Sequence, residues 1–138
     1  MTTVNNLLKK FQNLNPDQLI TDSVVETKEV YGDLQVEQQL QGLKADGNEM
    51  PDYSATSVDL FGKEPGPIKL RDTGAFQTAI EVKVDASVIV ARSNDSKNDM
   101  LVKRYGKEIF GLSDKFKQEF RHQLEPVVIN NFRKNLNL

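Results

Sequence analysis

The residues of this chain best suited to chemistry are Asp72, Thr73 and Gly74, which follow one another directly. Asp-Thr-Gly is the triplet that carries the catalytic carboxylate of aspartic proteases. Such an enzyme needs two carboxylates that share one proton, because close like charges cannot both ionise. In a small retroviral-type enzyme each subunit of a dimer supplies one carboxylate, and Asp72 would be that residue here.

The sequence around this triplet does not fit the protease reaction. A buried apolar strand should precede the aspartate, but Arg71 stands directly beside it. A glycine-rich flap should follow, but residues 77–92 contain no glycine. Ile109-Phe110-Gly111 imitates the apolar pair plus glycine that backs such a site, yet a long helical pattern follows it instead of a short helix. We therefore expect a chain that is not an enzyme, and keep the retroviral-type aspartic protease as an alternative.

Other catalytic and ligand-binding chemistry is sparse. His122 is the only histidine and cysteine is absent, so a metal cluster or a Ser-His-Asp triad would depend on His122 alone. We expect His122 to be solvated on a charged helix face. No glycine-rich phosphate loop is present. Phe116, Phe120 and Phe132 recur at helical spacing, which favours core residues over stacking platforms for bases. We predict no metal, no cofactor and no small-molecule ligand.

The charge of the chain is unevenly distributed. The net charge of −2 is too close to zero to predict nucleic-acid binding. Residues 1–62 hold four lysines and ten acidic residues, whereas residues 97–138 hold nine basic and five acidic residues. A molecule polarised in this way can associate head to tail with its own copies. The N-terminus lacks the pattern of a signal peptide, and no apolar stretch approaches the roughly 20 residues needed to span a bilayer.

The length of 138 residues predicts a single domain with a real core. Three regions differ in character along the chain. Residues 1–43 form an N-terminal helical region, residues 44–67 an extended loop, and residues 68–138 a sheet plus a C-terminal helix.

The N-terminal region is expected to contain two helices. Apolar spacing predicts a short helix over residues 4–12. The Asn-Pro-Asp sequence at residues 15–17 then supplies an N-cap, a first helical residue and a negative charge at the positive end of the helix dipole. The second helix can run as far as Leu43. Gly32 interrupts it at a cost of about 1 kcal/mol, so we expect a kink or a break there.

Strand signals occupy the middle of the chain. Within the 44–67 loop we expect a short strand at residues 58–61. Residues 79–84 alternate apolar and polar side chains, as a half-buried strand does. Residues 88–91 predict a second, more apolar and more buried strand. Residues 100–102 fit either a strand or the start of a helix.

The C-terminal segment is predicted to be a long amphipathic helix. Ser113 can cap it, with Asp114 in its first turn. Pro126 lacks an N–H, so we expect a bend in this helix near residues 122–126. The apolar stripe is Phe116, Phe120, Leu124, Val128, Phe132 and Leu136. The fold class is therefore α+β: a small antiparallel sheet packed against a long C-terminal helix, with N-terminal helices and a long extended loop.

Three separated segments carry further information. They are GLKADGNEMPDYS at residues 42–54, LRDTGAFQTAI at residues 70–80 and IFGLSD at residues 109–114. In their order and approximate spacing they resemble the phage virion-morphogenesis and tail-completion family, whose members form the neck that joins head to tail.

The resemblance has departures in each segment. The first segment is similar to the family's Asp-Gly turn, which is followed by a Pro/aromatic-Ser stretch and then a Thr. Thr56 corresponds to that Thr. The second resembles Leu-x-x-Thr-Gly-x-Leu-x-x-Ser-Ile, with Phe76 in place of Leu and Ala79 in place of Ser. The third resembles the Phe-Leu-Gly-Leu-Ser-acidic sequence before the last helix. Lys107-Glu108 stands where many members have Arg-Pro.

The resemblance implies a structural protein of the phage virion. Such proteins assemble in the host cytoplasm into homo-oligomeric rings, which contact portal or adaptor and tail proteins. DNA passes through the ring lumen without specific binding, and no membrane is involved. We expect the acidic half of one copy to meet the basic half of the next, and residues 44–67 to reach a neighbouring subunit or the next ring. A non-virion assembly factor or protein-binding module is the alternative.

In this role the Asp-Thr-Gly triplet is a structural turn. Gly74 can take a positive φ, and Thr73 or Asp72 can bond to nearby backbone. Leu70 and Phe76 would anchor the turn to the core. The expected structural motif consists of Leu70, Asp72, Thr73, Gly74, Phe76, Phe110, Gly111 and Leu112.

Overall fold

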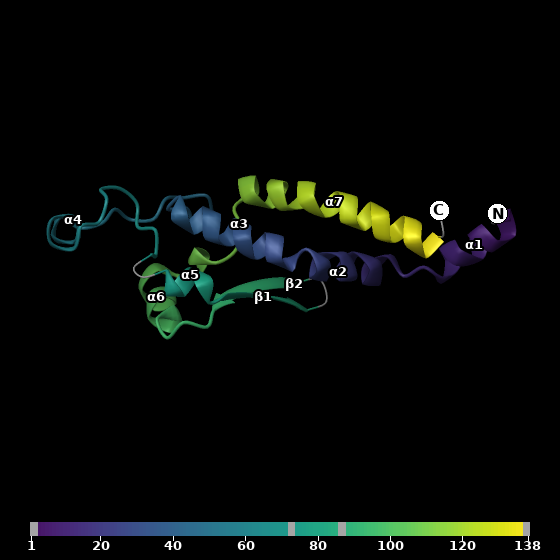
Figure 1. The fold of residues 1–138 in the computed structure, drawn as a ribbon, viewed down its shortest axis with the longest axis horizontal. Coiled ribbons are helices and arrows are strands. Elements are labelled where there is room, and N and C mark those ends of the chain that lie inside the picture. Colours follow the sequence, from purple (N-terminus) through teal and green to yellow (C-terminus); the bar gives the residue numbers. More distant parts are fainter. Residues whose placement is uncertain (1–2, 72–73, 86–87, 137–138) are drawn as a thin grey trace.

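The computed structural model describes residues 3–71, 74–85 and 88–136 and confirms the α+β class. In Figure 1 the molecule is elongated. Helices α2 (Pro16–Glu26) and α3 (Lys28–Leu40) run along its middle, with the long helix α7 (Asp114–Leu136) on one side and the β-hairpin on the other. Asp72 and Thr73, on which the protease alternative depends, lie outside the described residues.

The predicted start of the N-terminal region is confirmed. Helix α1 (Val4–Asn13) is capped by Thr3, whose side chain accepts from the Asn6 N–H at 3.2 Å. In α2 the Asn15 side chain accepts from the Gln18 N–H at 3.1 Å, directly before the proline. Both caps satisfy backbone donors that the first helical turn leaves without partners.

The predicted break at Gly32 is wrong, because Gly32 lies inside α3 and the chain turns at Thr27 instead. The Thr27 hydroxyl donates back to the carbonyls of Ser23 and Val24, and its φ and ψ of −103° and 9° end α2. A Cβ built on Gly32 would lie 3.5 Å from the Val82 side chain, an ordinary van der Waals distance, so α3 lies beside the sheet at this position.

The predicted strand at residues 58–61 is also wrong. That sequence forms the short helix α4 (Ala55–Phe61), capped by Ser54 and ended by Gly62 at φ 67°. An isolated antiparallel bridge between Asp52 and Pro67 closes the base of this segment. Figure 1 shows it projecting from one end of the molecule. We call residues 52–67 the arm.

The two predicted strands pair as an antiparallel hairpin of β1 (Ile80–Asp85) and β2 (Val88–Ser93), with Val82 opposite Ala91. The expectation that the second strand is the more buried agrees with the structure, since β2 contains the buried residues Ala91 and Ser93 and β1 contains none, although Val88 and Val90 are exposed. Only one face of the two-stranded sheet is covered by helices, so alternate residues of each strand face outward.

The remaining segments are helical. Residues 100–102 lie in α6 (Asn98–Tyr105), which resolves the open choice in favour of a helix. A short 3-10 helix, η1 (Lys107–Ile109), leads to α7. Helix α7 begins directly after Ser113, as predicted, and continues through Pro126. The four-residue Ala75–Thr78 helix, α5, precedes β1 and was not predicted.

Two apolar clusters form the core. The first joins α2, α3, the sheet and α7, and includes an edge-to-face contact between Tyr31 and Phe120 at 5.2 Å. The second consists of Met50, Leu70, Phe76 and Ile109. Phe110 packs against both clusters and connects them. Within the described residues no helix is long and apolar enough to cross a membrane.

Candidate functional site

Two described residues of the motif, Leu70 and Gly74, have left-handed backbone conformations. Gly74 has a φ of 87° and directly precedes α5, so the chain enters this short helix before the strand. Leu70 has a φ of 56°, a conformation that costs a non-glycine residue roughly 1–2 kcal/mol. The Gln77 side chain donates to the Leu70 carbonyl at 2.9 Å and to the Lys69 carbonyl at 3.2 Å. These bonds fix the backbone at Leu70 in its strained conformation.

The three segments that carry the family resemblance meet in the second apolar cluster. Met50 comes from the first segment, Leu70 and Phe76 from the second, and Ile109 from the third. The rings of Phe76 and Phe110 lie 5.7 Å apart. The predicted anchoring of Leu70 and Phe76 in the core is confirmed, since both are buried.

Backbone contacts also join the first and third segments. The Ala45 N–H donates to the Glu108 carbonyl at 2.7 Å. Gly111 has a φ of 98°, and a Cβ on it would lie 3.2 Å from the Ala45 Cβ. Leu112 beside it is fully buried. The third segment therefore fits closely against the turn at residues 44–48.

Three buried glutamines of α3 hold the third segment from the other side. Gln38 donates to the Gly111 carbonyl at 2.8 Å and accepts from the Ser113 N–H at 2.7 Å. Gln35 accepts from the Gly111 N–H at 2.8 Å and donates to the Ile109 carbonyl at 3.3 Å. Gln39 donates to the same carbonyl at 3.0 Å. We call Gln35, Gln38 and Gln39 the glutamine clamp.

The glutamine clamp was missed by sequence reasoning, although the sequence holds a signal for it. The three residues are spaced i, i+3 and i+4, so they share one face of a helix. An uncharged amide can both donate and accept, which suits a buried backbone segment that needs both partners. Gln77 extends the network by donating to Gln39 at 3.3 Å. The Gln77 Oε1 atom is buried and has no hydrogen-bond partner in the described structure.

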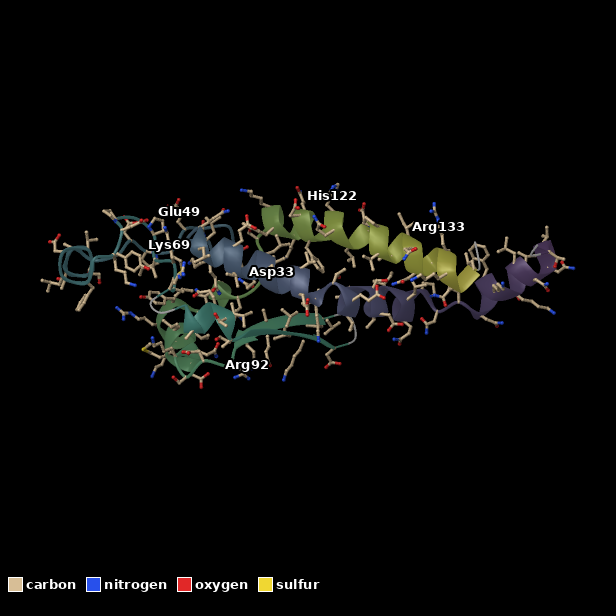
Figure 2. The ribbon with its side chains drawn as sticks, viewed as in Figure 1. Asp33, Glu49, Lys69, Arg92, His122 and Arg133 are labelled. Atoms are coloured by element: carbon tan, nitrogen blue, oxygen red, sulfur yellow. The ribbon has the colours of Figure 1, made fainter. Side chains whose placement is uncertain are left out.

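Within the described residues no group of three or more His, Cys, Asp or Glu side chains could hold a metal ion. His122 is exposed on α7 and Arg92 lies on β2, on opposite sides of the molecule (Figure 2). An open groove of about 740 Å³ between α3 and β1 has Gly32 and Val82 among its lining residues, with charged side chains of both signs along it.

Two ionisable groups respond to their surroundings. Burial raises the pKa of Tyr31, and a hydrogen bond with the Leu112 backbone acts in the opposite direction. The pKa of Asp46 is lowered, mainly because its carboxylate accepts from the Asn48 N–H at 3.0 Å. The Asn48 N–H therefore stabilises the ionised carboxylate of Asp46.

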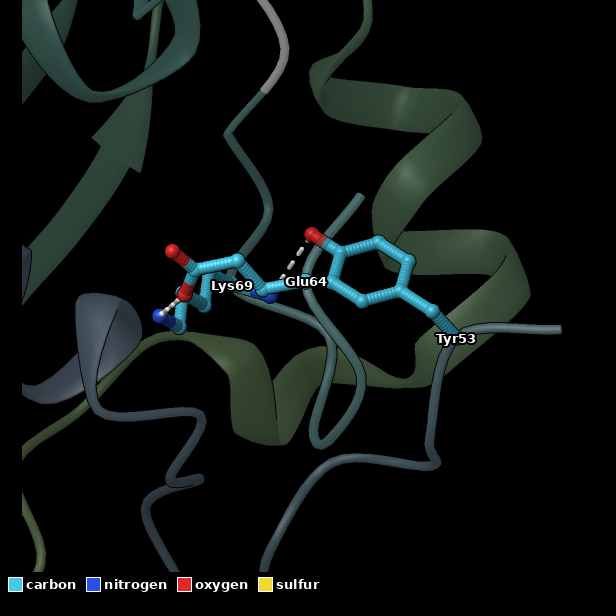
Figure 3. Close-up of polar contacts among 3 residues, drawn as sticks. All are labelled: Tyr53, Glu64 and Lys69. Atoms are coloured by element: carbon cyan, nitrogen blue, oxygen red, sulfur yellow. Dashed lines mark hydrogen bonds and ion pairs between the residues drawn. The ribbon is translucent and has the colours of Figure 1, made fainter. Parts of the chain in front are cut away.

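The arm is the most prominent exposed feature of the fold. At its base the Tyr53 hydroxyl accepts from the Lys69 N–H at 3.1 Å, and the Lys69 ammonium lies 3.3 Å from the Glu64 carboxylate (Figure 3). The Tyr53 N–H donates to the Gly66 carbonyl at 2.9 Å. These contacts hold the two ends of the arm together. At its tip Leu60 and Phe61 are largely exposed.

Apolar side chains are also exposed at the opposite end of the molecule. Helix α1 contacts the last turns of α7, where the Phe11 and Phe132 rings lie 6.0 Å apart. Val4 and Leu8 of α1 are exposed. We call this part of the surface, formed by α1 and the last turns of α7, the α1–α7 end. The arm and the α1–α7 end are the candidate interaction surfaces of this protein.

Comparison of the chain with protein-family models, with curated proteins and with solved structures finds no match.

Proposed function

We propose that this protein is a structural subunit of a phage neck, forming a homo-oligomeric ring that completes the tail or joins head to tail. The observation that carries the proposal is the meeting of the three resembling segments around Met50, Leu70, Phe76 and Ile109. Segments that lie far apart in sequence and share one packing site support a resemblance of the whole unit over chance matches of short motifs.

The surface of the molecule is consistent with assembly. An elongated shape with an arm at one end offers two different surfaces to neighbouring copies. An interface between two different surfaces closes into a ring when its rotation allows closure. The segregation of acidic and basic residues along the chain favours such an arrangement over a symmetric dimer.

The proposal is tested on particles of a phage or induced prophage that encodes this chain. Quantitative mass spectrometry of purified virions should detect the protein in a small, fixed number of copies per portal. Deletion of its coding sequence should leave DNA-filled heads without attached tails in electron micrographs. Absence from purified virions, with assembly still dependent on the gene, would replace the proposal by the assembly-factor alternative.

A peptide-cleavage assay tests the protease alternative on the same purified protein. The proposed role predicts no cleavage by the wild-type chain. Cleavage that Asp72→Asn abolishes would overturn the structural role.

A further inference from the structure

The tip of the arm has the features of a docking element. Leu60 and Phe61 are 74% and 72% exposed, although both are large apolar side chains. Asp59 precedes them, and the arm as a whole carries three acidic residues and one lysine. Side chains of this size gain about 1.5–3 kcal/mol each when fully buried. The tip therefore presents acidic and apolar side chains, and the described residues of the chain do not cover Leu60 and Phe61.

The α1–α7 end has the complementary character. Val4 is 74% exposed and Leu8 is 53% exposed. Residues 3–16 and 126–136 contain no acidic residue. Their basic residues are Lys9, Lys10, Arg133 and Lys134. This end is a basic, apolar surface bordered by Glu125 on α7 and Asp17 on α2, and Asn131 within it donates to the Glu26 carboxylate at 3.2 Å.

The two surfaces cannot meet within one molecule, because the arm and α1 lie at opposite ends of the fold (Figure 1). We propose that the arm of one copy docks on the α1–α7 end of the next copy. Asp59 then faces basic side chains such as Lys9 and Arg133, and Leu60 and Phe61 are covered by apolar residues of α1. This inference rests on the ring-forming role proposed above and names the contact that builds the ring.

The two kinds of interaction contribute differently to such a contact. Complementary charges orient the approaching copies and exclude the like-charged pairing of arm with arm. Burial of the apolar tip supplies the affinity. Because the contact uses a different surface on each partner, it repeats head to tail and produces a ring or an open chain of copies.

The absence of cysteine from the chain allows a direct test by disulfide trapping. Thr56 lies four residues before Leu60 on the same face of α4, so Thr56→Cys marks the tip without removing its apolar residues. Asn5→Cys marks α1 in the same way. The two purified variants are mixed under mild oxidation, and the linked heterodimer is measured on a non-reducing gel.

The matched control replaces Asn5→Cys with Met100→Cys. Met100 is exposed on α6, away from the α1–α7 end. We expect several-fold more heterodimer from the Thr56–Asn5 mixture than from the Thr56–Met100 mixture. Equal yields from the two mixtures would overturn the proposal.

A second test separates head-to-tail contact from symmetric pairing. One variant carries Leu60→Asp with Phe61→Asp, and the other carries Val4→Asp with Leu8→Asp. Since all four positions are exposed, both variants are expected to keep the wild-type circular dichroism spectrum. Each variant is also given a trapping cysteine. Disulfide trapping should be lost when the cysteine lies on the altered surface. It should persist when the cysteine lies on the unaltered surface of the same variant. Loss in both arrangements, or in neither, contradicts the proposal.

Reversing the charges of individual residues tests the electrostatic contribution to the contact. Asp59→Lys should reduce trapping, and Lys9→Glu on the partner should restore part of it. Trapping by the wild-type surfaces should also fall as the ionic strength rises toward 1 M, where the Debye length is about 3 Å. A yield that salt leaves unchanged would remove the electrostatic part of the proposal.

These experiments use the purified protein alone, so their outcome is distinct from that of the virion analysis. Trapping without incorporation into virions would retain the head-to-tail contact and reject the neck role. Incorporation into virions without selective trapping would retain the neck role and reject this contact.

Discussion

The Gln38 side chain, in the last turn of α3, donates from its Nε2 atom to the Gly111 carbonyl oxygen at a distance of 2.8 Å. The same amide accepts from the Ser113 N–H at 2.7 Å. One side chain thereby satisfies a buried acceptor and a buried donor in the segment that leads to α7. The packing of the segment before α7 therefore depends on a polar residue of α3.

Replacement of Gln38 by alanine tests this dependence. Gln38→Ala leaves the Gly111 carbonyl and the Ser113 N–H without their partner, and each such buried group costs roughly 1–3 kcal/mol. We expect the free energy of unfolding, measured by urea denaturation, to fall by about 3 kcal/mol. The control is Gln118→Ala, which replaces an exposed glutamine on α7. It should change the free energy of unfolding by less than about 0.5 kcal/mol. Equal losses in the two variants would contradict the role of the glutamine clamp.

The glycines of the turns separate backbone strain from steric overlap. Gly74 and Gly47 have φ values of 87° and 83°, and a Cβ at either would meet no atom closer than 3.8 Å. Alanine at either position should cost about 1 kcal/mol from the left-handed backbone alone. Gly42 has a φ of 72°, and its Cβ would lie 2.5 Å from Pro67. Gly42→Ala should therefore lower the melting temperature clearly more than the other two changes, and a common value for all three would disprove the steric contribution.

Gly32 offers a stabilising change. It lies inside α3, where glycine costs about 1 kcal/mol relative to alanine. The added methyl group would reach the Val82 side chain at 3.5 Å, an ordinary van der Waals distance. We expect Gly32→Ala to raise the free energy of unfolding by up to about 1 kcal/mol. A loss in the alanine variant would show that the helix–sheet contact is tighter than this distance implies.

Tyr31 predicts the response to alkaline pH. Burial raises its pKa in the folded state, so the phenol is neutral in both folded and unfolded chains below about pH 10. As pH rises above this value, the unfolded chain loses the proton first, and the free energy of unfolding falls until the folded-state pKa is passed. Tyr31→Phe should flatten this fall in denaturation measurements between about pH 9 and 11. An unchanged alkaline slope in that variant would assign the loss to other groups.

Local signals in the sequence predicted the elements whose residues interact mainly with their neighbours along the chain. The Asn15-Pro16 start of α2 and the alternation of β1 depend on capping and on period-two burial, which are properties of short segments. The stripe of α7 was found for the same reason. Its first members, Phe116 and Phe120, are buried, as is Leu136 at its end.

The errors and omissions arose where distant contacts decide the structure. Gly32 is a helix breaker by propensity, but it lies inside α3, which packs against β1. The outward face of Val88 and Val90 follows from the number of strands in the sheet, which no single strand reveals. The buried glutamines were missed because their partners lie in another part of the chain. Asp72 and Thr73 lie outside the described residues, so the protease alternative stays open to the cleavage assay.

The span of the glutamine clamp has a consequence for the order in which the protein matures on the ribosome. Each of the bonds from Gln35, Gln38 and Gln39 to the segment at residues 109–113 joins groups 70 or more positions apart. A nascent chain emerges from its N-terminus, so α3 is made long before these carbonyls and amides exist. Until then its glutamines hydrogen-bond to water. The native packing of α3 must therefore wait until residues 109–113 have been synthesised, and a ribosome-bound chain that stops before them should remain accessible to protease around α3.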